Sequence, residues 1–347
     1  MCIYLMDCTL RDGGYINNWN FGSSVIHGMI EKFDEASIDF VELGFLTGQQ
    51  HTGEQSLFSN YDEIKAVLPK HKKESKYVVM VNCGEFDITK FVPCNDESIF
   101  GIRIAFHKHQ IEEALKLGRQ VQKLGYKLFF QPMCTDFYTD IEIMNLILAT
   151  NKINPYALYI VDSFGTMSGE VVEHLSFLID EHLDKDIMLG FHAHNNLQLA
   201  YSNAIKLINL ELERDIIIDA TVSGIGRGAG NLNMELIIQE LNMRERLKYD
   251  LITIVGIYDN YISKLQIEYR WGYSVPFFLT ANLKCHPNYA KFLIHKGLTS
   301  ANSLTEILEK IEDPHKMVFS KNYIETLYNE YLEYRQCEEE RCDADGK

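Results

Sequence analysis

The chain has 347 residues, of which 46% are hydrophobic and 24% charged, and its formal net charge at pH 7 is −16. These values are ordinary for a globular enzyme with one large core, and the excess of acidic residues argues against a nucleic-acid or anionic-membrane surface. No apolar run approaches the roughly 20 residues of a membrane span, and the first residues lack the basic start of a signal peptide. We therefore expect a cytoplasmic protein without nucleic-acid or membrane partners.

The eight cysteines include no Cys-x-x-Cys pair. This pattern predicts reduced thiols, in agreement with a cytoplasmic location. Cys83 and Cys134 have no basic neighbour in the sequence, so we expect them to be packing thiols rather than nucleophiles.

Short apolar runs alternate with stretches of helical periodicity over about the first 250 residues. The expected strands are Ile3–Asp7, Asp39–Gly44, Tyr77–Asn82, Gly101–Phe106, Lys127–Pro132, Ala157–Asp162, Ile187–His192 and Ile216–Thr221. The expected helices are Ser23–Ala36, Tyr61–Leu68, a weak one at Ile88–Val92, Gln110–Leu124, Ile141–Asn151, Gly169–Leu183, Leu197–Leu210 and Met234–Leu247. Eight such units predict the α/β class and favour a (β/α)8 TIM barrel. An open doubly wound sheet is the alternative, but no dinucleotide-binding glycine pattern follows the first strand.

The periodicity changes after residue 249, which predicts three parts. Residues 1–249 would form the barrel, residues 250–336 a helical accessory domain, and the polar residues 337–347 a disordered tail. The accessory domain would cover the barrel mouth, form an oligomer interface or simply pad the barrel.

Two histidines follow the seventh expected strand within the segment Gly190–Asn196. Side chains two apart on a strand share a face, so His192 and His194 suit neighbouring positions on one metal ion, although a surface pair is the alternative. Barrel closure would bring Asp12, which follows the first strand, to the same point. One carboxylate and two imidazoles suit Mn²⁺ or Mg²⁺ and do not exclude Zn²⁺, Co²⁺ or Fe²⁺.

Three segments carry a resemblance to a known superfamily. Thr9–Gly13, the His192/His194 segment and Gly228–Asn231 resemble the signature of the DRE-TIM, or HMGL-like, metallolyases. That superfamily includes 3-hydroxy-3-methylglutaryl-CoA lyase, isopropylmalate synthase and 4-hydroxy-2-oxovalerate aldolase. The 4-hydroxy-2-oxoacid aldolases are the most similar in layout, because Gly272-Tyr273 and the helical run to Gly297 resemble their C-terminal domain.

The resemblance implies a divalent-metal-dependent aldolase that joins or separates pyruvate, or a related 2-oxoacid, and an aldehyde. It implies that Asp12, His192 and His194 hold the cation, with Asn231 as a weak ligand or neighbouring donor. A helix cap is the alternative for Asn231. Arg11 would stabilise the enolate oxygen.

Further residues at the strand ends are candidates for substrate contact. Ser163 would donate to the substrate carboxylate, or be a plain strand-end hydroxyl. Glu42 matches an acid of the superfamily that would orient Arg11 or bind water at the metal. Glu42 would also form an ion pair with Arg103, a second candidate for substrate binding, and a purely structural pair is the alternative.

The loop from Ser223 to Gly230 is rich in glycine. It would cradle a phosphate, or, as the resemblance implies, form a mobile loop over the site. Arg227 in this loop would pair with an anionic group of the second substrate or face solvent.

The chain departs from the oxovalerate aldolases at two positions. Their histidine base, three positions after the metal aspartate, is Tyr15 here, and their assisting C-terminal tyrosine falls on Phe277. A neutral tyrosine is a poor base at pH 7, since its pKa is about 10. Tyr15 would then relay a proton with a metal-bound water, or another side chain would serve. The identity of the aldehyde and a dehydrogenase partner are left open.

Two other functions are weighed against the aldolase. A Claisen-type synthase would use an acyl-CoA, but the helical tail is short and no basic phosphate patch is evident. A barrel that binds a metabolite without catalysis is disfavoured by the complete metal triad. We expect a homo-oligomer acting on small molecules.

Overall fold

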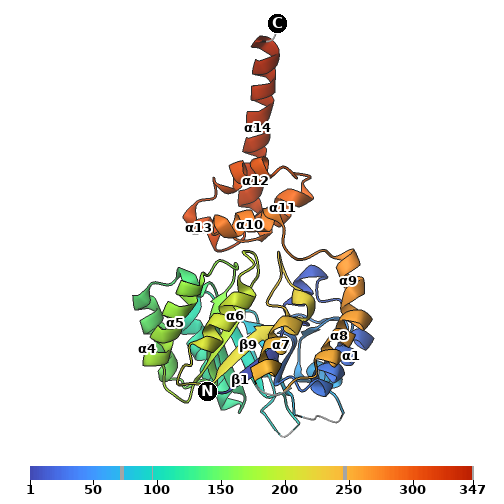
Figure 1. Ribbon diagram of the computed structural model, residues 1–347, viewed down its shortest axis with the longest axis vertical. Coiled ribbons are helices and arrows are strands. Elements are labelled where there is room, and N and C mark those ends of the chain that lie inside the picture. The colour runs from blue at the N-terminus through green and yellow to red at the C-terminus, as the bar shows by residue number, and fades with distance from the viewer. Residues whose placement is uncertain (71–73, 96, 245–247, 346–347) are drawn as a thin grey trace. The chain divides into compact units, whose positions relative to one another are not determined.

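The computed structural model describes residues 1–70, 74–95, 97–244 and 248–345 and divides into two compact units, Met1–Gly272 and Tyr273–Lys347. The first unit is a closed barrel of parallel strands (Figure 1). Its strands are β1 (Ile3–Asp7), β2 (Phe40–Leu46), β4 (Lys76–Asn82), β5 (Gly101–Phe106), β6 (Lys127–Pro132), β7 (Ala157–Asp162), β8 (Met188–Ala193) and β9 (Ile216–Ala220). They pair in the order β1-β9-β8-β7-β6-β5-β4-β2, and pairing of β1 with β2 closes the ring. The predicted TIM barrel is therefore confirmed.

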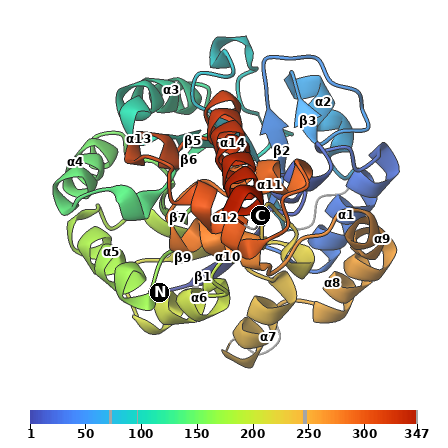
Figure 2. The same cartoon turned by 90° about the horizontal axis from the view of Figure 1, so that it is seen from above.

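Helices surround this barrel, as the view from above in Figure 2 shows. They are α1 (Ser23–Glu35), α2 (Tyr61–Val67), α3 (Ile111–Lys123), α4 (Asp140–Asn151), α5 (Gly169–His182), α6 (Ala200–Asn209), α7 (Met234–Arg244), α8 (Leu251–Ile257) and α9 (Ser263–Glu268). The weak helix expected at Ile88–Val92 is only a 3₁₀ turn, Ile88–Lys90. A short strand that the sequence did not predict, β3 (Leu57–Phe58), pairs with β2. The predicted end of α7 at residue 247 lies outside the described residues.

Alternate residues of each strand face the barrel interior, and they change character along the strand. The lower inward positions are apolar, and this layer contains Phe40, Val78, Phe129, Tyr159 and Ile217. Two residues further along their strands stand Glu42, Met80, Gln131, Val161 and Asp219, respectively. The upper layer therefore mixes charged and apolar groups and lies at the carboxyl ends of the strands, where barrel enzymes place their sites.

Glycine at position 190 of β8 makes room for a large side chain in the lower layer. A Cβ atom at Gly190 would lie 2.3 Å from the ring of Tyr159. Tyr159 is fully buried in that layer, and the guanidinium carbon of Arg103 lies 4.8 Å from its ring centroid. Gly190 thus lets one tyrosine support the polar layer from below.

The second unit contains α10 (Val275–Asn282), α11 (Asn288–His295), α12 (Ala301–Leu308), α13 (Asp313–Lys316) and α14 (Lys321–Asp345). Its own core includes Tyr289, Leu304 and Ile324. Among the described residues, no helix is both long and apolar enough to span a membrane.

The domain boundaries seen in the structure differ from both boundaries predicted from the sequence. Residues 250–272 belong to the barrel unit rather than to the accessory domain, because Ile254 and Ile257 of α8 are buried in the barrel's outer core. The polar segment expected to be a disordered tail from residue 337 continues helix α14 as far as Asp345.

Arg214 joins the end of α5 to the strand that follows. Its guanidinium donates to the Asp180 carboxylate at 2.7 Å and to the carbonyl oxygens of Asp180, Leu183, Asp184 and Ile187 at 2.7–3.1 Å. The side chain of Arg214 has no exposed surface, so water cannot replace these bonds.

We predict that Arg214→Met lowers the free energy of unfolding by about 3 kcal/mol, because buried carbonyl groups lose their donor. Urea denaturation measures this change. Arg119→Met, at an exposed position of α3, is the control and should change stability by less than about 0.5 kcal/mol. Equal stabilities of the two variants would contradict the prediction.

Candidate metal site

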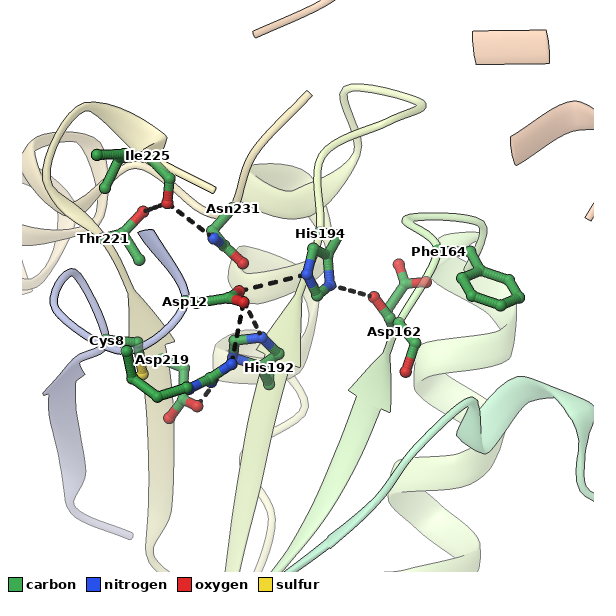
Figure 3. Close-up of polar contacts among 12 residues, drawn as sticks. Cys8, Asp12, Asp162, Phe164, His192, His194, Asp219, Thr221, Ile225 and Asn231 are labelled. Carbon is green, nitrogen blue, oxygen red and sulfur yellow. Dashed lines mark hydrogen bonds and ion pairs between the residues drawn. The ribbon is translucent and has the colours of Figure 1, made fainter. Parts of the chain in front are cut away.

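Asp12, His192 and His194 converge at the carboxyl ends of β1 and β8 (Figure 3). Asp12 follows β1 at the start of a 3₁₀ turn, Gly13–Ile16. The Nε2 atoms of His192 and His194 both lie 3.3 Å from Oδ2 of Asp12. All three side chains are buried, and their ligand atoms lie within 4.8 Å of one another. The structure thus brings the predicted triad together.

The ligand atoms of this triad have the character of a cation site. The Nε2 atoms of His192 and His194 are buried without a hydrogen-bond partner among the described residues, and both face Oδ2 of Asp12, whose Oδ1 is paired with Arg11. An unpaired buried polar atom costs free energy, and a cation between the two imidazoles and Oδ2 would remove this cost at both nitrogens. The residues therefore fit a divalent metal ion with mixed oxygen and nitrogen ligands.

A hydrogen bond at the other ring nitrogen orients each imidazole. Nδ1 of His194 lies 3.0 Å from the backbone oxygen of Asp162, and Nδ1 of His192 lies 2.9 Å from Oδ2 of Asp219. Both acceptors lack a proton at the contacting atom, so each Nδ1 is the donor and each Nε2 keeps its lone pair for a ligand.

The electrostatic surroundings keep Asp12 ionised. Burial alone would raise the pKa of Asp12, but the Arg11 guanidinium and the two imidazoles hold this pKa well below its usual value. Burial likewise opposes the charged form of His192, yet the carboxylates of Asp12 and Asp219 raise the pKa of His192. Burial lowers the pKa of His194. The carboxylate neighbours therefore make His192 the more basic of the two imidazoles.

Asn231 lies beside the triad in the loop before α7. Its Nδ2 donates to the backbone oxygen of Ile225 at 2.9 Å, while its Oδ1 is buried without a partner. Nδ2 of Asn231 is therefore bonded to the loop, and among the described residues Oδ1 remains available as an acceptor. This arrangement suits a weak ligand, the role proposed from the sequence, whereas the position directly before α7, which begins at Met234, is Asn233.

Arg11 and Arg103 are both buried, but they occupy different levels. Arg11 pairs with Oδ1 of Asp12 at 3.0 Å and with Oε2 of Glu42 at 2.7 Å, and it lines the cavity above the triad. Arg103 forms the predicted ion pair with Oε1 of Glu42 at 2.8 Å and also pairs with Asp219. Within the described residues Arg103 is not part of the cavity wall, so its predicted contact with substrate is not supported by its position.

A small cavity of about 50 Å³ opens above the triad. Arg11, Tyr15, Ser163 and Arg227 line it together with both histidines, and so do the apolar side chains of Phe45 and Met80. Larger hollows of about 580 and 320 Å³ lie elsewhere, and their walls contain none of the triad. The candidate substrate residues other than Arg103 thus share one wall with His192 and His194.

Tyr15 and Arg227 form a stacked pair in this wall. The guanidinium carbon of Arg227 lies 4.2 Å from the ring centroid of Tyr15, and Nε of Arg227 is buried with no hydrogen-bond partner among the described residues. Trp19 and Phe45 hold the Tyr15 ring edge-on, at centroid distances of 4.7 and 6.0 Å. Burial, as the largest influence, raises the pKa of Tyr15, so its hydroxyl is protonated at neutral pH.

The glycine-rich loop around Arg227 is tied to the loop after β8. The backbone N–H of Ala229 donates to Oδ1 of Asn196, and the N–H of Asn195 donates to the oxygen of Gly230, both at 2.8 Å. Gly230 has φ +84°, and a Cβ atom there would lie 1.9 Å from the oxygen of Gly224. The loop needs glycine at this position because its two ends approach so closely.

Two residues near the triad were not identified from the sequence. Asp219 contacts His192 from within β9, and Asp162 contacts His194 from the end of β7. Burial, followed by the neighbouring Asp136, raises the pKa of the Asp162 carboxyl to about 8. Asp219 could have been found as a charged residue two positions after an inward-facing isoleucine in an otherwise apolar strand.

A barrel with one carboxylate and two imidazoles at its carboxyl-terminal end is the arrangement of a metal-dependent TIM-barrel enzyme. The family model described as HMGL-like matches residues 2–259, and the chain belongs to this family.

Similar proteins agree with this assignment. A 4-hydroxy-2-oxovalerate aldolase from Marinomonas sp. (strain MWYL1) is 26% identical over 274 residues, covering 75% of this chain and 77% of the relative. Another from Burkholderia thailandensis is 27% identical over 245 residues, with 68% and 67% covered. The solved N-terminal domain of a candidate aldolase from Bacteroides vulgatus superposes with a TM-score of 0.71 at 28% identity, covering 87% of this chain and 99% of that domain.

The thiol beside the cavity should be unreactive. Burial raises the pKa of Cys134 to about 12, so the reactive thiolate is scarce at pH 8. We predict that iodoacetamide at pH 8 alkylates the exposed Cys2 but not Cys134 in the folded protein, and both after unfolding in urea. Peptide mass spectrometry measures the labelling, and rapid modification of Cys134 in the folded state would contradict its assignment as a packing thiol.

Proposed function

We propose that this protein is a divalent-metal-dependent aldolase that cleaves or forms a carbon–carbon bond between pyruvate, or a related 2-oxoacid, and an aldehyde. The observation that carries the proposal is the convergence of buried ligand atoms from Asp12, His192 and His194 beneath a cavity that Arg11 lines. Membership of the HMGL-like family and the two relatives named 4-hydroxy-2-oxovalerate aldolase support it.

Asp12, His192 and His194 would hold the cation, with Asn231 beside them. Mn²⁺ or Mg²⁺ suits this set, and Zn²⁺ and Co²⁺ are alternatives. When bound, such an ion supplies Lewis acidity that favours negative charge on a neighbouring substrate oxygen.

Arg11 would stabilise the charge that develops on the 2-oxo oxygen. Glu42 and Asp12 fix its guanidinium on one side, which leaves its remaining N–H groups free to donate to the cavity. A donor held in place before the reaction costs no reorganisation during it. Glu42 would therefore assist catalysis by orienting Arg11.

The proposed cleavage breaks the bond between C3 and C4 of a 4-hydroxy-2-oxoacid. The hydroxyl at C4 loses its proton and becomes the aldehyde carbonyl, and the electron pair of the broken bond forms the enolate of pyruvate. Protonation of the enolate at C3 then gives pyruvate. In the direction of synthesis the same steps run in reverse, and the C4 oxygen gains a proton.

Tyr15 would exchange that proton with the C4 oxygen. The Tyr15 hydroxyl enters the reaction protonated, so in synthesis it suits donation of a proton to the C4 oxygen. In cleavage it would accept the proton of the C4 hydroxyl and at the same time pass its own proton on. Burial raises the pKa of Tyr15, and the stacked Arg227 guanidinium offsets part of that rise, which eases donation of the proton.

Ser163 and Arg227 would bind carboxylate groups. Oγ of Ser163 accepts from the N–H of Cys134 at 2.8 Å, and Ser163 lines the cavity, where its hydroxyl would donate to a carboxylate. Arg11, Arg103 and Arg214 each have a carboxylate partner within 3.0 Å. No such partner of Arg227 is found in the described part of the chain, and this suits it to an anionic substrate group.

Three further predictions from the sequence remain proposals. They are a homo-oligomeric state, a cytoplasmic location and a dehydrogenase partner that would consume the aldehyde.

Turnover after metal replacement tests the proposed activity. Protein stripped with a chelator should release pyruvate from 4-hydroxy-2-oxoacids of different chain length only after Mn²⁺ or Mg²⁺ is restored, as measured with lactate dehydrogenase and NADH. Condensation of acetyl-CoA with a 2-oxoacid, followed by free thiol release, would favour the Claisen alternative. No metal-restored turnover of any oxoacid in either direction would refute the aldolase.

We predict that His194→Ala abolishes this turnover and leaves the fold intact, because it removes a metal ligand that otherwise makes one backbone contact. His174→Ala is the matched control, since that imidazole is 55% exposed and pairs with Asp140 on the barrel's outer surface. Circular dichroism and thermal unfolding report the fold. Parental activity of His194→Ala would show that the ligand assignment is wrong.

We predict that Arg227→Leu raises KM for 2-oxoacids about 10- to 100-fold, which is the effect expected when a hydrogen bond to a charged group is lost. The increase in KM should be smaller for Arg227→Lys. Steady-state kinetics measure the change, with Arg119→Leu as an exposed control. An unchanged KM in Arg227→Leu would place this guanidinium outside the substrate site.

A further inference from the structure

A closed ring of alternating charges lies beneath the cavity (Figure 3 shows part of it). It runs from Asp12 to Arg11 (3.0 Å), Glu42 (2.7 Å), Arg103 (2.8 Å), Asp219, His192 (2.9 Å) and back to Asp12 (3.3 Å). Its six side chains are at most 6% exposed. Four of the members, Arg11, Glu42, Arg103 and Asp219, lie outside the triad, so the ligands are part of a larger buried unit.

The ring is a consequence of strand alternation. His192, Arg103 and Asp219 each stand two residues after another inward-facing residue of their strands, so their side chains also point into the barrel interior. Arg103 extends from β5 to reach Asp219 on β9, across the interior, because the order of strands places three others between these two.

One oxygen of Asp219 makes both of its contacts. Oδ2 accepts from Nδ1 of His192 at 2.9 Å and from NH2 of Arg103, while Oδ1 is buried without a partner. Asp219 therefore has one acceptor shared between an imidazole and a guanidinium, and a rotation of its carboxylate would break both bonds.

We propose that Asp219 is a positioning residue for the metal site. Asp219 fixes the tautomer and ring orientation of His192, and Arg103 fixes Asp219. The affinity for a divalent cation thus depends on two residues that do not touch it. This inference rests on the metal site of the proposed function but not on the identity of the substrate.

The same geometry argues against a second cation at this end of the barrel. Cys8, His192 and Asp219 also lie within 4.8 Å of one another. However, Arg103 donates through NH1 to Sγ of Cys8 at 3.3 Å and through NH2 to Asp219. A guanidinium already neutralises this group, so we expect no second divalent cation between Cys8, His192 and Asp219.

Asp219→Asn tests the proposal, because it keeps the shape and one acceptor of Asp219 but removes the charge. We expect the Kd for Mn²⁺ to rise about 10- to 100-fold, as measured by competition with a fluorescent chelator. Asp180→Asn is the matched control, since it also removes a carboxylate from a buried arginine, Arg214, but far from the ring. Its Kd should equal that of the parent protein.

A second measurement does not depend on the folding of any variant. In parent protein labelled with ¹⁵N-histidine and loaded with Mg²⁺, His192 should carry its proton on Nδ1 and none on Nε2, as read from ¹⁵N chemical shifts. A proton on Nε2, or a parental Mn²⁺ affinity in folded Asp219→Asn, would overturn the proposal. Failure of the parent itself to bind a divalent cation would instead refute the metal site and, with it, the proposed function.

Discussion

Alternating charge is the interaction on which the upper layer of this barrel depends. Burying a single ion costs several kcal/mol unless a partner and hydrogen bonds compensate for it. Here each guanidinium contacts two carboxylates, and Glu42 lies between both guanidinium groups. With His192 neutral, two arginines face three carboxylates, so the ring retains one negative charge. This net negative charge lies beneath the Nε2 atoms of the two imidazoles and makes the site suitable for a cation.

Much of this arrangement follows from the sequence, because barrel closure is a strong constraint. Continuous apolar runs identified every barrel strand to within one or two residues. The spacing of His192 and His194, together with closure, was enough to place Asp12 beside them. A two-residue strand such as β3 is too short to show a periodicity in the sequence. The helices between residues 250 and 272 were predicted to belong to a separate domain, because packing against α1 has no signature in the sequence.

Side-chain levels within the barrel were harder to predict. Arg103 was expected to contact substrate as a residue at a strand end, but it is the third residue of β5, and Glu42 and Asp219 occupy its guanidinium below the cavity. The sequence analysis assigned no role to Asp219, because its role depends on contacts with β5 and β8. The pairing of Tyr15 with Arg227 joins two loops about 210 residues apart, and no local pattern encodes it.

Gly190 limits how the barrel can diverge. Tyr159 fills the space that a side chain at position 190 would need, and Arg103 packs on the ring of Tyr159. A change at position 190 or 159 alone would therefore disturb the charged layer. A residue other than glycine at position 190 is therefore expected only together with a smaller residue at position 159. The absence of a side chain at Gly190 thus links evolutionary change in the lower layer of the barrel to change in the charged layer above it.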